Sequence, residues 1–155
     1  MSGAAPRWFI DNLARVHVDG AATAGRSALV EVEGRRGDMP PLHVHHRDDE
    51  TFYVVDGALT VFQPGSQVVL EAGSAFCAGR GIPHVYRVES ETARWLAFCE
   101  PAGFDAFVLE ASVPAERDEL PPAGRPHDPA ALDAVAARHG IELLGPPGTL
   151  PQTAG

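Results

Sequence analysis

Apolar and polar positions alternate over short stretches through the first hundred residues of the chain. Runs of branched and aromatic residues are broken by Gly, Pro and Asp at intervals of about 8–12 residues, a spacing typical of an all-β sandwich or barrel. No helical pattern alternates with these runs, so a parallel βαβ architecture is not expected. The expected strands cover residues 15–19, 28–34, 42–45, 51–55, 59–63, 67–71, 75–78, 84–88 and 94–99.

The pattern becomes helical after residue 100. In "GFDAFVLEAS" one helical stripe is apolar, formed by Phe104, Phe107, Val108 and Ala111. Five prolines between residues 113 and 129 predict an irregular segment along the surface.

A second helix is expected in "HDPAALDAVAARHG". Asp128 is placed to cap its start, Pro129 suits the first helical position and Gly140 follows its end. We expect residues 1–100 to form a β-barrel that includes the N-terminal strands. Residues 101–155 would form a helical extension packed on this barrel and not a separate domain.

Composition narrows the class of protein. The 155 residues carry a formal net charge of −9, which disfavours nucleic acid and anionic membranes as partners because both require clustered Lys and Arg. No apolar run approaches the length of a membrane helix, and the amino terminus does not resemble a signal peptide. Cys77 and Cys99 form no CxxC pattern and are expected to be buried in strands. A cytoplasmic protein without disulfides is therefore expected.

The stretch "GDMPPLHVHHRDDETFYVVDG" gathers three histidines and five acids. If residues 42–45 and 51–55 form a hairpin, His43 and His45 share one face, with His45 opposite Glu50 and His43 opposite Phe52. His46 points to the other side and is expected in the loop. Asp48 and Asp49 are expected to be solvated turn acids.

The dipeptide Asp56–Gly57 predicts a two-residue hairpin turn after this stretch. Such a turn sets Val54 opposite Leu59, Phe52 opposite Val61 and Glu50 opposite Gln63. Gln63 is then a candidate partner that orients the carboxylate of Glu50.

A third histidine comes from "GSAFCAGRGIPHVYRV". Gly79, Gly81 and Pro83 predict a tight turn that places His84 at the start of a strand, with Tyr86 and Val88 on the same face. If this strand lies near the first hairpin, His43, His45, Glu50 and His84 form one metal site. Their nitrogen and oxygen ligands suit Fe, Mn, Co, Ni, Cu or Zn.

These residues carry a resemblance to a known family. The chain resembles a small single-domain cupin of the quercetin 2,3-dioxygenase-like group. The first cupin motif, G-x5-HxH-x4-E-x6-G, is met at Gly37, His43, His45, Glu50 and Gly57.

The second motif, G-x5-PxG-x2-H-x3-N, is met at Gly73, Gly81 and His84. Gly79 stands in place of its proline and Val88 in place of its asparagine. The tail ending in "HGIELLGPP" also resembles the extension of that group. The resemblance implies a jelly-roll β-barrel, the cupin double-stranded β-helix, with one transition-metal ion bound inside by the three histidines and Glu50.

Several pocket residues follow from the predicted faces. Glu50 is a candidate proton acceptor as well as a ligand, and Tyr86 is either a phenol that hydrogen-bonds the substrate or an aromatic that lines the barrel. The apolar floor is expected from Phe52, Val54, Leu59 and Val61, with Val88 on the same side as Tyr86.

The first functional hypothesis is a metal-dependent dioxygenase acting on a small phenolic or enediol-type molecule. The second is a non-redox metal enzyme, an isomerase, cyclase, decarboxylase or hydrolase in which the metal acts as a Lewis acid. The third is a small-molecule-binding module without turnover. A homodimer is expected in each case, as is usual for small cupins.

Overall fold

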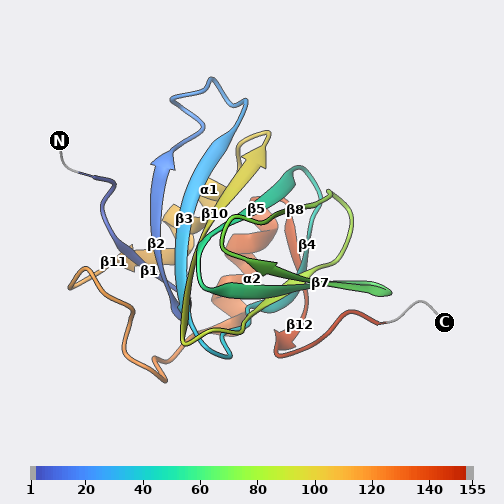
Figure 1. The fold of residues 1–155 in the computed structure, drawn as a ribbon. Coiled ribbons are helices and arrows are strands. Elements are labelled where there is room, and N and C mark those ends of the chain that lie inside the picture. Colours follow the sequence, from blue (N-terminus) through green and yellow to red (C-terminus); the bar gives the residue numbers. More distant parts are fainter. Residues whose placement is uncertain (1–2, 153–155) are drawn as a thin grey trace.

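The computed structural model describes residues 3–152, which form two facing layers of antiparallel strands and two short helices (Figure 1). The larger layer is a seven-stranded sheet. In spatial order its strands are β11 (Ser112–Pro114), β1 (Arg7–Phe9), β2 (Asn12–Val18), β3 (Ala28–Arg35), β10 (Thr92–Glu100), β5 (Asp49–Asp56) and β8 (Ala75–Ala78).

The second layer consists of two smaller sheets. One pairs β12 (Ile141–Pro147) with β4 (Pro41–His45), and the other has the order β7 (Ser66–Glu71), β6 (Ala58–Gln63), β9 (Val85–Val88). A single antiparallel bridge between His43 and His84 connects β4 to the start of β9. This double-layered arrangement confirms the predicted cupin jelly roll.

Strict alternation builds the core between the layers. In β3 every second side chain is buried, and β10 shows the same period next to it. Val30 and Trp95 from the large sheet are 0 % and 1 % exposed and belong to one apolar cluster with Leu59 and Val61 of the second layer. Side chains that alternate along the sequence of these strands therefore alternate between the core and the solvent-facing side of the sheet.

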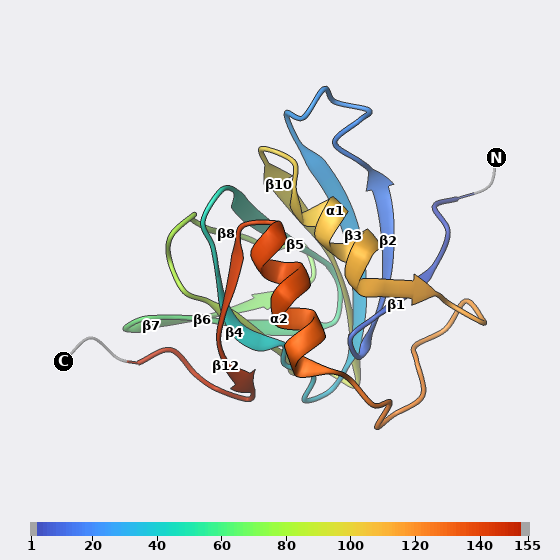
Figure 2. The same ribbon diagram turned by 180° about the vertical axis from the view of Figure 1, so that it is seen from behind.

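The two predicted helices are confirmed as α1 (Phe104–Ala111) and α2 (Pro129–Arg138). The carboxylate of Asp128 accepts hydrogen bonds from the backbone N–H groups of Ala130 and Ala131, and Gly140 ends α2 with φ 72°. Figure 2 shows both helices on the side of the molecule between β12 and the large sheet. Neither helix is long and apolar enough to cross a membrane, and the same holds for every helix of the described residues.

The predicted hairpin of residues 42–45 and 51–55 is wrong. β4 pairs with β12, which places His45 opposite Ile141 and His43 opposite Leu143. β5 instead lies between β10 and β8 in the other layer. The polar segment after His45 carries the chain from one layer to the other and does not fold it back on itself.

The predicted hairpin around Asp56–Gly57 is wrong for a related reason. β5 and β6 belong to different sheets, and Gly57 is the position where the chain crosses between them. A Cβ atom at Gly57 would lie 2.4 Å from both Ser90 Oγ and Thr92 O, so the crossing requires glycine at φ 77°. Gln63 consequently pairs with Ser66 and lines a surface pocket with Phe62 and Leu150, not the surroundings of Glu50.

The segment after residue 100 is not only helical. β11 pairs with β1 at one edge of the large sheet, and β12 pairs with β4 in the second layer. The sequence pattern did not predict these strands because each is short or interrupted by glycine and proline. Of the two cysteines, Cys99 is buried as predicted, whereas Cys77 is exposed on β8.

Candidate metal centre

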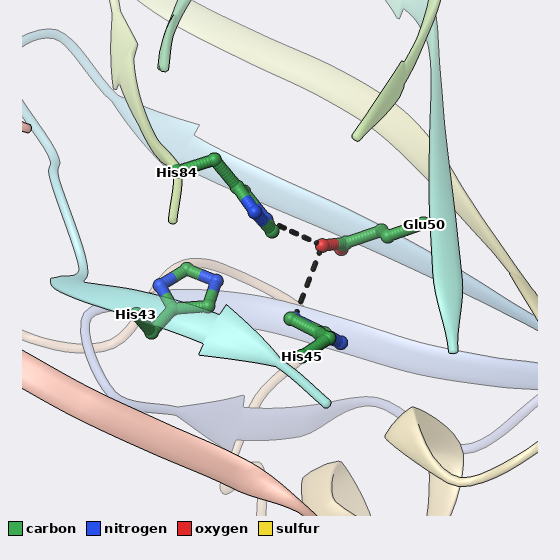
Figure 3. Close-up of side chains that lie close together, drawn as sticks. All are labelled: His43, His45, Glu50 and His84. Carbon is green, nitrogen blue, oxygen red and sulfur yellow. Dashed lines mark hydrogen bonds and ion pairs between the residues drawn. The ribbon is translucent and has the colours of Figure 1, made fainter. Parts of the chain in front are cut away.

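The proposed ligands come from both layers of the barrel. His43 and His45 lie on β4 and His84 directly precedes β9, so all three belong to the second layer, while Glu50 lies on β5 of the large sheet. The four side chains point toward one another (Figure 3) and are called the His/Glu cluster below. One ligand atom from each lies within 4.8 Å of the other three.

Glu50 is the centre of the His/Glu cluster. Its Oε2 atom lies 3.0 Å from His84 Nε2 and 3.3 Å from His45 Nε2. The side chains of His45, His84 and Glu50 are 1 %, 1 % and 6 % exposed, so these contacts are shielded from solvent. His43 is the partly exposed member of the cluster.

The second nitrogen of every histidine is held by the protein. His43 Nδ1 donates to Pro41 O at 2.7 Å, His45 Nδ1 to Asp48 Oδ2 at 3.0 Å, and His84 Nδ1 to Ile82 O at 3.3 Å. Carbonyl and carboxylate oxygens only accept hydrogen bonds, so Nδ1 of each ring is protonated, and Nε2 is the nitrogen that faces the cluster and would give its electron pair to a bound metal ion. This is the arrangement that orients histidine ligands in metal sites.

Asp48 corrects a prediction. It was expected to be a solvated turn acid but is 2 % exposed and holds His45. Asp49 does behave as expected, since it is partly exposed and pairs with Arg80 at 3.2 Å. Nothing in the local pattern separates these two adjacent acids.

The electrostatics of the His/Glu cluster favour a cation. Burial, followed by repulsion from His84 and His45, lowers the pKa of His43 to about 3, so its ring is neutral at neutral pH. Burial raises the pKa of Glu50, but attraction to His45 and the hydrogen bond from His84 outweigh it and lower this pKa to about 2. Burial lowers the pKa of His45, yet Glu50 and Asp48 shift it upward on balance.

A transition-metal ion fits these residues. Within residues 3–152, His45 Nε2 is the one buried side-chain nitrogen or oxygen without a hydrogen-bond partner, because its contact with Glu50 lacks hydrogen-bond geometry. Buried polar atoms rarely remain unpaired. Three imidazole nitrogens and one carboxylate form a donor set of intermediate softness, which suits first-row transition metals.

A narrow cavity of about 40 Å³ adjoins the cluster and is called the metal cavity. Phe52 and Tyr86 line it, as the sequence predicted for the pocket. The other predicted pocket residues pack in the core and do not line the cavity; they are Val54, Leu59, Val61 and Val88. The Tyr86 hydroxyl donates to Asn12 Oδ1 at 2.7 Å, and both residues are buried.

The remaining walls come from segments that the sequence did not connect to the site. Phe104 and Phe107 of α1, Leu132 of α2 and Ile141 and Leu143 of β12 all line the metal cavity. The helical stripe of α1 was predicted, but a stripe does not tell which cavity it will cover. Asn12 was missed because it precedes the first expected strand, and a single polar residue gives no signal of its role.

Comparison with known proteins agrees with this structure. The family described as "Cupin domain" matches residues 28–99, the segment from β3 to β10. Quercetin 2,3-dioxygenase from Bacillus subtilis (strain 168) is 30 % identical over 134 residues, which are 86 % of this chain and 38 % of that protein. The chain therefore spans less than two fifths of the length of this relative.

Two solved structures show the same fold. KdgF from Halomonas sp. has 24 % identity and a TM-score of 0.56, covering 62 % of this chain and 85 % of its own. The polyketide cyclase RemF from Streptomyces resistomycificus has 22 % identity and a TM-score of 0.52, covering 79 % and 73 %. The jelly roll, the match to the cupin domain and the dioxygenase relative lead to one conclusion: this protein belongs to the cupins, in the group similar to quercetin 2,3-dioxygenase.

Proposed function

We propose that this cupin is an enzyme that binds one transition-metal ion in the His/Glu cluster and oxidises a small phenolic or enediol-type molecule with O₂. One observation carries the proposal. Three Nδ1 atoms are hydrogen-bonded to the protein, and the three Nε2 atoms are left beside one buried carboxylate. The similarity to quercetin 2,3-dioxygenase supports the choice of oxidation among the reactions that such a site can perform.

The bound ion would supply a Lewis acid for a substrate oxygen and, if it is redox-active, reactivity toward O₂. Glu50 contributes the acid–base chemistry. Because its pKa is about 2, its carboxylate is ionised at neutral pH. Such a weak base can accept the proton of a substrate hydroxyl only if that hydroxyl is strongly acidified, which is chemistry that a bound ion would supply. Asp48 and the carbonyl of Pro41 hold the imidazoles of His45 and His43 in the orientation that the site requires.

The side chains that wall the metal cavity are of the type that packs against a flat apolar ring. Phe52, Trp95 and Phe104 line it, and aromatic side chains pack on rings through offset or edge-to-face contacts. The same side chains exclude bulk water from the His/Glu cluster. Apolar walls with a few polar groups are the common composition of small-molecule sites.

Tyr86 has a narrower role than its position first indicates. Burial raises the pKa of its phenol well above the ordinary value, so the hydroxyl remains protonated. Since the O–H is donated to Asn12, the oxygen keeps only lone pairs for a substrate. We propose that Tyr86 accepts a hydrogen bond from a substrate hydroxyl and does not act as an acid.

The donor set also suits a redox-silent ion such as Zn²⁺. In that case the same residues would serve isomerisation, cyclisation, decarboxylation or hydrolysis. A binding module without turnover would use the same cavity but form no product.

Metal analysis of untagged protein, followed by O₂ uptake measurements with catechols and enediols, separates these possibilities. Fe, Mn, Co, Ni or Cu together with substrate-dependent O₂ uptake is the expected result. Zn as the bound metal, without O₂ uptake, would indicate that the protein is a non-redox metal enzyme. Ligand-induced thermal stabilisation without any product would indicate the binding module.

We also propose a homodimer and a cytoplasmic location, the latter resting on composition alone. The outer face of the large sheet offers a surface for the second copy. Tyr53 and Val55 of β5 and Phe98 of β10 are 45 %, 36 % and 39 % exposed there. Light scattering should show a dimer for the wild-type protein and a monomer for Phe98→Glu.

A further inference from the structure

A second pocket opens on the surface beside the metal cavity. It has a volume of about 250 Å³ and lies between the end of α1, the proline-rich segment before α2, and α2 itself. We call it the outer pocket; Figure 2 shows the elements around it. Two side chains, Ile10 and Leu132, line both the outer pocket and the metal cavity. They therefore form part of the wall that separates the outer pocket from the metal cavity.

The metal cavity is too small for an aromatic ring in its present form. Its volume is about 40 Å³, whereas a benzene-sized ligand occupies a cavity of roughly 150 Å³. A ring must therefore displace part of the wall. Ile10 and Leu132 are suited to move because both are only partly buried at the edge of the core.

The backbone at Ile10 supports this reading. Ile10 lies in the two-residue turn between β1 and β2 and has φ 54°. Branched side chains rarely adopt this left-handed conformation, and such strain is concentrated at functional sites. The next residue, Asp11, pairs with His127 at 2.8 Å, which ties this turn to the segment that leads into α2.

Charged side chains of the outer pocket point to the chemistry of its ligand. Glu110 pairs with Arg138 and His139, His127 pairs with Asp11, and Asp128 caps α2. The guanidinium of Arg125 lies over the Trp8 ring, 5.6 Å from its centroid. Among residues 3–152 it has no ion pair and no side-chain hydrogen bond, so it is the charged group left to bind an anion.

We propose that the outer pocket is the entrance to the metal cavity and binds the carboxylate of an aromatic acid through Arg125. The apolar end of this molecule passes between Ile10 and Leu132 toward the His/Glu cluster. The inference deepens the proposed function and rests on it for the final destination of the ring. An isolated cation matters here because the chain as a whole carries −9 and repels anions.

The test compares 3,4-dihydroxybenzoate with catechol, which differ by one carboxylate. Calorimetry on the metal-loaded protein should show tighter binding of the acid by about tenfold, as a charge-assisted guanidinium–carboxylate contact provides. Arg125→Gln should abolish this preference and leave the affinity for catechol unchanged. Arg117→Gln is the matched control, since Arg117 lies in the same segment, pairs with Glu119 and does not line the outer pocket.

The wall is tested by stopped-flow binding of catechol. Leu132→Ala should accelerate association and Leu132→Trp should slow it, each by about tenfold or more. An equal affinity of the wild-type protein for the two probes, or a preference that survives in Arg125→Gln, would overturn the carboxylate site. If neither substitution of Leu132 changes the association rate of catechol, the proposed route between Ile10 and Leu132 is wrong.

Metal-free protein separates this inference from the proposed function. Saturation-transfer NMR should detect benzoate but not benzyl alcohol on the metal-free wild type, and neither on metal-free Arg125→Gln. Benzoate binding that is unaffected by Arg125→Gln would contradict the outer-pocket site. A chain that takes up no metal yet binds benzoate through Arg125 would contradict the proposed function and support this site.

Discussion

His43 and His84 face each other directly and exchange two backbone hydrogen bonds, His84 N to His43 O at 2.9 Å and His43 N to His84 O at 3.3 Å. Their rings lie 4.5 Å apart between centroids. This one bridge joins β4 to the sheet of β9 and at the same time sets the distance between two proposed ligands. The third histidine is therefore fixed by strand pairing and not by a loop.

Removal of a proposed ligand should release the metal. His45→Ala and His84→Ala are each expected to weaken metal affinity by at least roughly 100-fold, because a buried nitrogen donor is lost. His46→Ala is the control, since His46 is exposed and pairs with Glu142 at 2.7 Å. Elemental analysis of untagged protein after dialysis measures the effect. Equal metal loss in all three variants would contradict the ligand assignment.

The neighbouring acids Asp48 and Asp49 should behave differently. Asp48→Asn is expected to weaken metal affinity by roughly 10–100-fold, because the carboxylate orients His45 and increases its basicity. Asp49→Asn removes the same charge one residue away but only affects the exposed pair with Arg80. Competition with a chromogenic chelator gives both affinities. Indistinguishable values would show that Asp48 does not support the site.

Metal binding should stabilise the fold, since the His/Glu cluster connects two sheets. At a free metal concentration of 100 times Kd the gain is about 2.7 kcal/mol. For a chain of this size, this corresponds to a rise in Tm of roughly 5–10 °C. Thermal unfolding with and without the metal, reversed by a chelator, tests this expectation. His84→Ala should show no such rise, and a metal-independent Tm for the wild type would contradict the site.

The contact between Tyr86 and Asn12 should contribute to stability. Tyr86→Phe leaves the buried Asn12 Oδ1 without a donor, which is expected to cost about 1–3 kcal/mol. The chain contains a second tyrosine, Tyr53, which is 45 % exposed. Tyr53→Phe should therefore change the free energy of unfolding by less than about 0.5 kcal/mol. Urea unfolding of both variants measures these changes. Equal losses in the free energy of unfolding would argue against a stabilising hydrogen bond between Tyr86 and Asn12.

Acid should destabilise the metal-free protein through His43. Its pKa is about 3 in the folded chain and 6.5 ordinarily, so between these values the unfolded chain binds a proton that the folded chain does not. Lowering the pH through this window therefore favours unfolding. His43→Gln should flatten the difference in unfolding free energy between about pH 7 and about pH 5. An unchanged pH slope in that variant would contradict the depressed pKa.

Local pattern was sufficient for much of this molecule. Period-two alternation located most strands, and the sequence Asp128–Pro129 with Gly140 bounded α2. The spacing of His43, His45 and Glu50 predicted that their side chains lie together, even though the hairpin on which this prediction was based is wrong. The reason is that alternation within β4 is local, whereas the partner of β4 lies about a hundred residues away in β12.

Other errors share this cause. Asp56–Gly57 has the composition of a hairpin turn, but the crossing between layers uses the same backbone freedom, and so Gln63 was placed beside Glu50 incorrectly. Asp48 and Asp49 are the same residue type in one polar run, and only the tertiary fold buries the first. Strand pairing and the burial of Asp48 both depend on contacts between segments that are distant in the sequence, so no short stretch of the sequence can predict them.

The pairing of β12 with β4 has a practical consequence for handling this protein. Ile141 and Leu143 form the backbone partners of His45 and His43. Proteolytic loss of residues 141–147 would leave all four proposed ligands present but open the edge of the strand that bears two of them, and open edges promote aggregation. If a preparation contains little metal, an intact-mass measurement should therefore check that residues 141–147 are present before one concludes that the histidines do not bind metal.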